Sequence, residues 1–392
     1  MNIVVFTDTY YPETNGIAVT TKILVDLLKA HDNQVLVVTA TYDNKIPSNE
    51  SNIYYISFPK NKKRSLFSTI SVFNNSILRH IKEFKPDIIQ NQTNGQIGQL
   101  GRYTADKLKV PFVFTYHSHY EEYAPYVESS FVNRVVRARE RRFLAKMMNI
   151  STEFIAPSVK IKNYLRKKGV DKYINVLTTG IDADKWVIDE TAKKDIKYLR
   201  KKYNIPEENK VLMYLGALSE EKNLDLLIKS FKKYFDIPHK YEATLLIAGE
   251  GDQQEPLTNL IQSLGIEDKV VFVGKVNHDK IKSYFAITDV FVTASTSETQ
   301  STAAMEAMAA STLVLVRDDE TLVGLINRDE NGFIFNDDTD FGVELNHIFA
   351  LSNDEVEKVK KAAITTIKND FNLDNYYEKV MEVYNRAKRK KW

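Results

Sequence analysis

Short apolar runs alternate with helical segments along the whole chain, and this alternation is the strongest constraint on the fold. In runs such as Ile3–Thr7 and Phe112–Tyr116, apolar residues stand at consecutive positions, as in strands that are covered on both faces. Helical periodicity fills the intervals, for example over Ala18–Ala30 and Ile97–Leu108. This pattern predicts an α/β fold in which helices cover both faces of a parallel sheet.

The alternation occurs twice, which predicts two domains of the same kind. The expected strands of the first set are Ile3–Thr7, Gln34–Thr39, Ile53–Phe58, Asp87–Gln90, Phe112–Tyr116, Phe154–Ala156 and Val176–Leu177. Those of the second set are Val211–Leu215, Ala243–Ala248, Val270–Val273, Val290–Thr293, Leu313–Val316 and Gly332–Phe335. We predict domains at residues 1–183 and 184–370 and a C-terminal helix, residues 371–392, that crosses back to the first domain. Ligands are then expected at the carboxyl ends of the strands, in a cleft between the domains.

Composition excludes several classes of protein. The chain has 392 residues and no cysteine, which excludes a disulfide scaffold, a Cys-ligated metal site and a thiol nucleophile. No apolar run approaches the ~20 residues that span a bilayer. The N-terminal sequence MNIVVFTDTYY lacks the basic start and apolar stretch of a signal peptide. We therefore expect a cytoplasmic protein.

Charge is divided unevenly along the chain. The formal net charge of +2 argues against a nucleic-acid partner. Residues 1–175, however, hold 25 Lys and Arg against 15 Asp and Glu, whereas the remainder holds 29 against 37. A basic first domain is expected to meet an anionic partner.

Two glutamates flank the start of an expected helix in the second half. Glu298 lies in the loop after Val290–Thr293, and Glu306 lies about one turn into the helix that begins near Thr302. A helix N-terminus attracts phosphate, and carboxylates accept hydrogen bonds from sugar hydroxyls. The alternative is a solvated helix start, where glutamate is favoured in any case.

Three other loops at strand ends hold candidate ligand-binding residues. Gly16 follows the first strand and permits close backbone approach. His117 follows Phe112–Tyr116, and a hydrogen-bond donor pointing into a cleft fits better than a metal ligand, because no third ligand is near. Lys222 follows Val211–Leu215 and could neutralise a phosphate. The respective alternatives are an ordinary turn, a structural histidine and a solvated helix start.

Two segments of the basic half combine cations with apolar residues at helical spacing. The first has Lys60, Lys62, Lys63 and Arg64 before Leu66, Ile70, Phe73, Ile77 and Ile81. The second has Arg134, Arg137, Arg139, Arg141, Arg142 and Lys146 beside Val132, Val135, Val136, Phe143 and Met147. Basic amphipathic helices bind anionic bilayers, so residues 60–64 and 134–146 are candidate membrane contacts. An apolar stripe that faces the protein core is the alternative.

Together these motifs resemble glycosyltransferase family 4, whose members have the GT-B fold of two Rossmann-like domains and retain the configuration of the transferred sugar. The resemblance covers nearly the whole chain, and its most specific element is the Glu-x7-Glu pair, Glu298 and Glu306. The other matching segments are TDTYYPETNGIA, TYHSHYEEYAPYV, FIAPS, TTGID, EEKN, IAGEGD and NGFIF. The first two of these and SETQ are most similar to bacterial 1,2-diacylglycerol 3-glucosyltransferases.

The resemblance implies a role for each matching residue. Glu298 would bind hydroxyls of the donor sugar, and Glu306 would bind the nucleotide ribose. Lys222 would contact the donor diphosphate, and Gly16 would let the diphosphate and the acceptor approach the N-terminal loop. His117 would hydrogen-bond the transferred sugar near its reacting carbon. The residues expected at the donor are Gly16, Lys222, Glu298, Thr299, Gln300, Ser301, Thr302 and Glu306.

The implied reaction is transfer of a hexose, expected to be glucose, from UDP-glucose or UDP-galactose to diacylglycerol or another lipid. It would serve glycolipid and lipoteichoic anchor synthesis at the inner face of the cell membrane. The first domain would then face the acceptor and the membrane, and the second would bind the nucleotide sugar. The family needs no metal or other cofactor, so Asp318-Asp319 and Asp337-Asp338 are interpreted as surface loop charges.

Three positions depart from the family pattern. Ala217 stands where the family usually has arginine, which removes one of two cations expected at the diphosphate, each worth ~1.5–3 kcal/mol as a charged hydrogen bond. Ser301 replaces a glycine, and Ser311-Thr312-Leu313 replaces Gly-x-Pro. Two alternative functions therefore stay open: a glycosyltransferase of capsule or exopolysaccharide assembly, and a non-catalytic accessory protein on the same fold.

Overall fold

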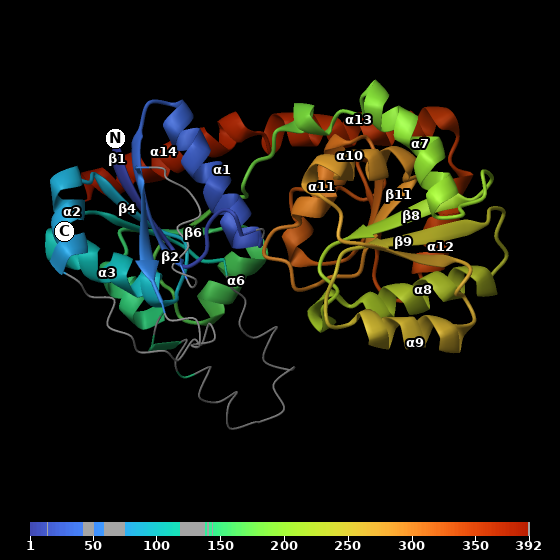
Figure 1. Cartoon of the computed structure of the whole chain (residues 1–392), viewed down its shortest axis with the longest axis horizontal. Coiled ribbons are helices and arrows are strands. Elements are labelled where there is room, and N and C mark those ends of the chain that lie inside the picture. Colours follow the sequence, from blue (N-terminus) through green and yellow to red (C-terminus); the bar gives the residue numbers. More distant parts are fainter. Residues whose placement is uncertain are drawn as a thin grey trace. The chain divides into compact units, whose positions relative to one another are not determined.

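The computed structural model of the chain forms two compact units (Figure 1). It describes residues 1–13, 15–41, 51–58, 75–117, 138, 141–142 and 144–390. Unit 1 comprises Met1–Gly180 and Leu373–Trp392, and unit 2 comprises Ile181–Asn372. The junctions differ by a few residues from those expected, because the Ile181 N–H donates to the Phe371 carbonyl at 2.9 Å and Ile181 pairs with Asn372.

Unit 1 is built on a seven-stranded sheet in the order β3-β2-β1-β4-β5-β6-β7. Its strands are β1 (Asn2–Thr7), β2 (Gln34–Thr41), β3 (Ile53–Ser57), β4 (Ile88–Asn91), β5 (Phe112–Thr115), β6 (Glu153–Ala156) and β7 (Ile174–Val176). Every pair in the sheet is parallel. The strand order reverses between β1 and β4, and ligands of such sheets bind at the carboxyl edge where this happens.

Helices cover both faces of this sheet, as Figure 1 shows. They are α1 (Gly16–Ala30), α2 (Asn75–Phe84), α3 (Gln96–Leu108), α6 (Val159–Lys167) and α14 (Leu373–Arg389). Ile3 and Val5 of β1 pack in the core with α1 and α14, whereas Val4 and Phe6 pack in the core with α2, α3 and α6. Consecutive apolar residues in one strand therefore serve two opposite cores.

An ion-pair network around the buried carboxylate of Glu153 attaches α14 to the sheet of unit 1. The Glu153 side chain is 1% exposed, and its carboxylate accepts from Arg386 Nε at 3.0 Å and lies 2.7 Å from Lys390 Nζ. Asn175 Nδ2 donates to the same carboxylate at 3.0 Å. Burial alone raises the pKa of Glu153, but the bonds from Lys390, Arg386 and Asn175 outweigh it and hold that pKa below the usual value.

Unit 2 is built on a six-stranded parallel sheet in the order β10-β9-β8-β11-β12-β13. Its strands are β8 (Lys210–Leu215), β9 (Ala243–Ala248), β10 (Val270–Gly274), β11 (Val290–Thr293), β12 (Leu313–Arg317) and β13 (Phe333–Phe335). Its helices are α7 (Glu190–Lys202), α8 (Leu224–Asp236), α9 (Gln254–Leu264), α10 (His278–Ile287), α11 (Thr302–Ala309), α12 (Phe341–Ala350) and α13 (Asn353–Asp370), with 3-10 turns η2 (Ala183–Trp186), η3 (Glu220–Lys222) and η4 (Glu320–Leu322). The strand order reverses between β8 and β11.

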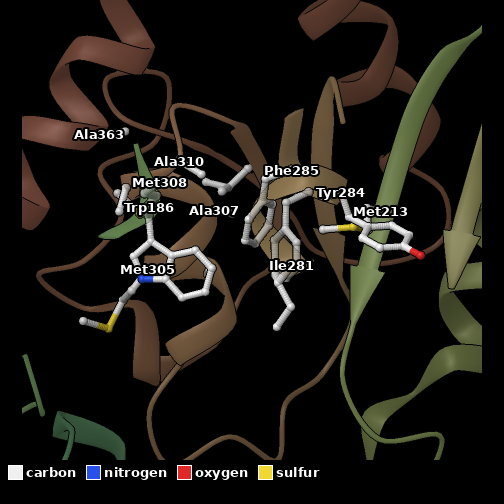
Figure 2. Close-up of a cluster of buried hydrophobic side chains, with 14 of the residues drawn as sticks. Trp186, Met213, Ile281, Tyr284, Phe285, Met305, Ala307, Met308, Ala310 and Ala363 are labelled. Atoms are coloured by element: carbon white, nitrogen blue, oxygen red, sulfur yellow. The ribbon is translucent and has the colours of Figure 1, made fainter. Parts of the chain in front are cut away.

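One core of unit 2 holds α11 in place (Figure 2). Met305 and Met308 are fully buried on α11, in the same cluster as Trp186 of η2 and Phe285 of α10. The rings of Trp186 and Phe285 meet edge to face at 5.7 Å. Because this side of α11 is committed to the core, Glu306 projects from the other side of the helix.

The described part of the proposed membrane segments differs from the expectation. Ile77 and Ile81 of α2 are buried in the unit 1 core, and so is Met147 in the helical stretch 144–150. These side chains therefore face the protein core and not a bilayer. The prediction that they are apolar membrane contacts is wrong for these three residues. Residues 60–64, together with Leu66, Ile70 and Phe73, lie outside the described residues, as do residues 134–137, 139–140 and 143.

The described cations of the second segment, residues 134–146, lie on the surface. Arg141, Arg142 and Lys146 are all exposed. Among the described residues, no helix is long and apolar enough to cross a membrane.

We predict that Arg386→Met lowers the free energy of unfolding by about 1.5–3 kcal/mol, because it removes a charged hydrogen bond from the buried Glu153 carboxylate. Denaturant unfolding followed by circular dichroism measures the change. Arg389→Met, on the same helix at an exposed position, is the matched control and should change stability by less than about 0.5 kcal/mol. Equal effects of the two substitutions would contradict the assigned role of Arg386.

Candidate functional site

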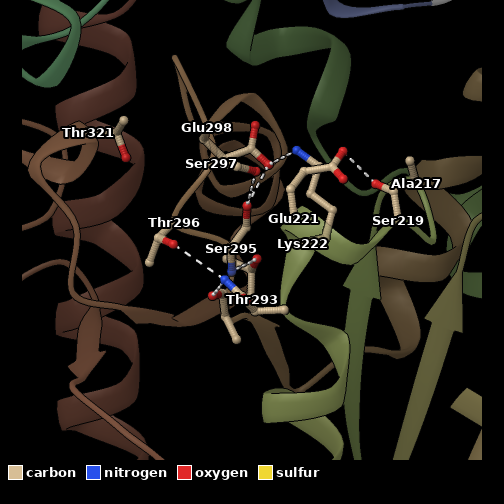
Figure 3. Close-up of polar contacts among 12 residues, drawn as sticks. Ala217, Ser219, Glu221, Lys222, Thr293, Ser295, Thr296, Ser297, Glu298 and Thr321 are labelled. Atoms are coloured by element: carbon tan, nitrogen blue, oxygen red, sulfur yellow. Dashed lines mark hydrogen bonds and ion pairs between the residues drawn. The ribbon is translucent and has the colours of Figure 1, made fainter. Parts of the chain in front are cut away.

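The loops after β8 and β11 meet at the carboxyl edge of the unit 2 sheet (Figure 3). The first loop passes through η3 and carries Lys222, and the second carries Glu298. β8 and β11 are the neighbouring strands at which the strand order reverses. In open α/β sheets this is the place where ligands bind.

An ion pair joins the two loops. Lys222 Nζ lies 2.7 Å from Glu298 Oε1, and both side chains are more buried than exposed. The same carboxylate oxygen accepts from Ser295 Oγ at 3.2 Å, and Ser295 lies 3.3 Å from Ser297 Oγ. The structure therefore brings together two residues that the sequence analysis assigned to the sugar and the diphosphate, 76 positions apart.

Asn223 ties the same loops together through its amide. It lies between η3 and α8 in the left-handed conformation, with φ 52°, which asparagine tolerates better than most residues. Its Nδ2 lies within hydrogen-bond distance of the Ala294 carbonyl, at 3.4 Å, and of Thr296 Oγ1, at 3.3 Å. This residue was not predicted as part of the site. The signal that could have identified it is the Lys-Asn pair directly before an amphipathic helix.

The β8 loop is also packed against the loop that follows β9. A Cβ atom at Gly249 would lie 1.8 Å from the Gly216 carbonyl oxygen, and one at Gly251 would lie 2.1 Å from the Leu218 carbonyl oxygen. The Leu218 N–H donates to the Glu250 carbonyl at 3.0 Å. Only glycine fits at positions 249 and 251, so these two glycines support the loop that carries Lys222.

Ala217 lies on the surface of this loop where the family usually has arginine. Its carbonyl accepts a hydrogen bond from the Tyr214 hydroxyl at 2.9 Å. Burial, together with the carboxylates of Glu298 and Glu221, raises the pKa of Tyr214 well above its usual range. The tyrosine therefore stays a neutral donor. Glu221 itself accepts from Ser219 Oγ at 2.7 Å.

Glu306 is a mostly buried carboxylate with one weak partner. Its side chain is 14% exposed, and Oε1 lies 3.9 Å from His278 Nε2 of α10. Burial raises the pKa of Glu306 above the usual value, and His278 only partly opposes this shift. The carboxylate in turn raises the pKa of His278, whose ring lies edge-on to Trp186 at 5.4 Å. Sequence reasoning missed His278.

The residues between the two glutamates lead into α11 and form its first turn. Thr299 and Thr302 are half-buried, and Gln300 and Ser301 are buried. Ser301 precedes the helix and makes no side-chain capping bond, and its φ of −86° is one that any residue adopts. At the other end of α11, Ser311 has φ +61°, which explains why the family has glycine at that position.

Two predicted residues lie in unit 1. Gly16 is the first residue of α1, and a Cβ atom there would meet nothing within 4 Å. The fold itself does not require glycine at this position. His117 follows β5, and its Nε2 lies 2.6 Å from Gln92 Oε1, at the end of neighbouring β4. Burial of the ring lowers the pKa of His117 to about 4 although part of the residue is exposed.

The two units differ strongly in charge. Unit 1 contains 31 Lys and Arg against 18 Asp and Glu, and unit 2 contains 23 against 34.

The aspartates that the sequence analysis interpreted as surface loop charges have partners in unit 2. Asp319 caps η4 by accepting from the Thr321 N–H at 2.9 Å, and Asp338 lies 2.7 Å from Lys233 Nζ. Within the described ranges, no group of three or more His, Asp or Glu side chains is placed to hold a metal ion.

The fold, together with the comparisons with known proteins, identifies the chain as a glycosyltransferase of the GT-B class. The profile "Glycosyltransferase Family 4" matches residues 14–185, and "Glycosyl transferases group 1" matches residues 195–366. Over 98% of the chain, the fold matches that of Anabaena Alr3699/HepE in complex with UDP and glucose, with a TM-score of 0.73, 99% of that chain covered and 17% identity. Sucrose-phosphate synthase of Thermosynechococcus elongatus gives a TM-score of 0.75 at 19% identity and 98% coverage of both chains.

Sequence relatives define the family. The chain is 30% identical over 339 residues to the alpha-monoglucosyldiacylglycerol synthase of Streptococcus pneumoniae, covering 83% of this chain and 73% of that protein. It is 25% identical to the Acholeplasma laidlawii protein of the same name, covering 89% of this chain and 88% of that protein. The chain belongs to glycosyltransferase family 4, near the diacylglycerol glucosyltransferases.

We predict that Glu306→Gln stabilises the protein at pH 7.5 by about 0.5–2 kcal/mol. The folded state raises the pKa of Glu306, so ionisation of this carboxylate opposes folding at every pH above that pKa. Below the pKa of the unfolded state both states are protonated, and the advantage of glutamine should disappear. Thermal unfolding of both proteins from pH 7.5 to 4 measures this. Glu330→Gln, at an exposed position, is the control, and a destabilising Glu306→Gln would contradict the prediction.

Proposed function

We propose that the protein transfers glucose, with retention, from UDP-glucose to diacylglycerol. The observation that carries this proposal is the Lys222–Glu298 pair, which lies where the strand order of the unit 2 sheet reverses, followed by Glu306 on α11. This set combines a cation for the diphosphate with two acceptors for hydroxyl groups. The names of the two relatives support glucose as the sugar and diacylglycerol as the acceptor.

Each charged residue has a separate role in the proposed reaction. Glu298 accepts hydrogen bonds from hydroxyls of the donor sugar, and Glu306 accepts them from the ribose. As the donor enters, its diphosphate takes the place of Glu298 as the partner of Lys222. The N-terminus of α11, where Ser301 makes no capping bond, offers a second positive pole.

The bond changes take place on one face of the sugar. The bond between the anomeric carbon and the diphosphate oxygen breaks, and Lys222 stabilises the charge that develops on that oxygen. The acceptor hydroxyl forms the new bond to the anomeric carbon from the same face. Its proton passes to the departing diphosphate oxygen, so no second catalytic carboxylate is needed, unlike in glycosidases. As the family resemblance implies, we propose that no metal is required.

We expect Lys222→Met to lower kcat by about 10²–10³-fold, because it removes the cation that stabilises the leaving diphosphate. The measurement is formation of glucosyldiacylglycerol from UDP-glucose and diacylglycerol vesicles, with the product identified by mass spectrometry. Glu220→Gln, exposed in the same turn, should leave the rate unchanged, and thermal unfolding confirms that both variants fold.

The absence of product would contradict the proposed reaction and leave two alternatives. If wild-type protein gives no product with any UDP-hexose and diacylglycerol, the proposed reaction is wrong. Calorimetry with UDP then separates the alternatives. Binding of UDP would favour another acceptor, as in capsule or exopolysaccharide assembly, whereas no binding at millimolar UDP would favour an accessory protein.

A lipid acceptor also requires contact with the membrane, for which we propose the basic unit 1 at the inner face of the cell membrane. Arg141, Arg142 and Lys146 are exposed cations of the described part of this unit. Since Leu144 and Met147 beside them are buried, contact through these three cations would be electrostatic and would weaken as salt rises.

We predict that changing Arg141, Arg142 and Lys146 together to glutamine weakens binding to anionic vesicles by about 1 kcal/mol per residue, which is roughly 10²-fold in total. Vesicle flotation at low salt measures the bound fraction. The control is the same change at Lys194, Lys197 and Lys201, which are exposed on α7 of unit 2. Wild-type protein that fails to float with anionic vesicles at low salt would contradict the membrane assignment.

A further inference from the structure

Within the part of the chain that the structure describes, the imidazole of His117 makes a hydrogen bond through one of its two nitrogens. Nε2 lies 2.6 Å from Oε1 of Gln92. An amide oxygen can only accept a hydrogen bond, so Nε2 carries a hydrogen and donates it. In a neutral imidazole the hydrogen bond made by one nitrogen determines the state of the other. Nδ1 is therefore unprotonated and can only accept.

The backbone that carries Gln92 is held in place by its neighbours. The residue is 2% exposed, and its N–H donates to the Phe6 carbonyl at 2.9 Å. The next residue, Thr93, donates its hydroxyl to the Asp8 carboxylate, which also accepts from the Ile97 N–H at 3.0 Å. The end of β4 is thus attached to β1 and to the start of α3. The side chain of Gln92 therefore extends toward His117 from a backbone that is fixed.

The backbone that carries His117 is fixed as well. The N–H of the preceding residue, Tyr116, donates to the Ile155 carbonyl at 3.0 Å. One position earlier, the Thr115 hydroxyl accepts from Gln90 Nε2 at 2.9 Å, and the Gln90 oxygen accepts from the Tyr384 hydroxyl at 3.1 Å. Polar side chains on β4 and β5 therefore join these neighbouring strands two residues before Gln92 and His117.

Burial keeps the ring of His117 neutral at neutral pH. Desolvation lowers the pKa of His117 to about 4, so the imidazole is uncharged from about pH 5 upward. A neutral ring with Nε2 occupied presents no hydrogen to a ligand. It cannot bind a phosphate or carboxylate oxygen at Nδ1, because both partners would be acceptors.

We propose that Gln92 is a positioning residue that holds His117 as its Nε2–H tautomer, so that Nδ1 accepts a hydrogen bond from a substrate hydroxyl. This reverses the expectation that His117 donates a hydrogen bond. It restricts the ligand at this nitrogen to a group that carries a hydrogen, such as a hydroxyl of the transferred sugar or of the acceptor. The identity of that hydroxyl rests on the proposed function, whereas the tautomer does not.

The tautomer can be measured without a substrate. In full-length protein labelled with ¹⁵N in its histidine rings, long-range ¹H–¹⁵N spectra distinguish the two nitrogens. His117→Asn identifies the signals of His117 among the seven histidines. We expect a protonated Nε2 and an unprotonated Nδ1 from pH 8 to pH 5. A protonated Nδ1 would mean that the amide of Gln92 donates instead, and would overturn the proposal.

Two substitutions of Gln92 separate positioning from a merely structural role. Gln92→Met removes the acceptor at similar side-chain length, and we expect it to abolish the single-tautomer signature and lower kcat/KM about tenfold. Gln92→Glu keeps an acceptor but adds a negative charge that raises the pKa of His117. As the pH is lowered, both proteins should lose activity when Nδ1 becomes protonated and can no longer accept a hydrogen bond. This loss should occur at a higher pH in Gln92→Glu than in the wild type.

The controls keep this inference separate from the proposed function. Gln99→Met, exposed on α3, should change neither the tautomer nor the rate. If Gln92→Met leaves both the tautomer and kcat/KM unchanged, Gln92 does not position His117 and the proposal fails. If the wild type transfers no sugar, the proposed function fails but the spectra still decide the tautomer. An active enzyme with a protonated Nδ1 would overturn only the inference about Gln92.

Discussion

The parallel direction of the strands determines where chemistry can occur in each unit. Because all strands of a parallel sheet run the same way, the loops that leave their carboxyl ends gather at one edge. In unit 2 the strand order reverses between β8 and β11, and the loops of these two strands bring Lys222 to within 2.7 Å of Glu298. In unit 1 the reversal between β1 and β4 connects Asp8 to Thr93, the residue after Gln92. Both candidate sites are consequences of this topology.

Two buried glutamates show how a structural carboxylate differs from one available to a ligand. Glu153 is enclosed by Arg386, Lys390 and Asn175, and these bonds lower its pKa in spite of burial. Glu306 is also largely buried, but its partner His278 is 3.9 Å away, and burial raises its pKa. A carboxylate that the protein buries without sufficient partners opposes folding, and such groups concentrate at functional sites. Glu306 therefore fits a site for hydroxyl groups supplied by a ligand.

Sequence pattern predicted the elements well and the contacts between them poorly. Runs of buried apolar residues located the strands to within about two residues, because burial on both faces leaves a clear signal. The pattern placed Lys222 and Glu298 each after a strand, but not beside each other, since strand order is a tertiary property. Ile77 was assigned to the wrong surface, because its helical spacing fits a membrane-facing stripe and a core-facing stripe equally. Only the packing of α2 against the sheet shows that it faces the core. Gln92 was missed because its contact with His117 joins two different strands.

The three departures from the family pattern have different physical consequences. Ser301 has an ordinary φ of −86° and needs no glycine, whereas Ser311 has φ +61°, a conformation that costs a non-glycine residue about 1–2 kcal/mol. Alanine at position 217 does not destabilise the fold, because the contact of this residue with Tyr214 is made by its backbone carbonyl, which accepts from the Tyr214 hydroxyl. Under the proposed function, the effect of Ala217 falls on the binding of the donor. In the proposed reaction, without an arginine at position 217, the donor diphosphate would compete with Glu298 for Lys222. The sugar would then have to satisfy the Glu298 carboxylate as the diphosphate takes the ammonium group.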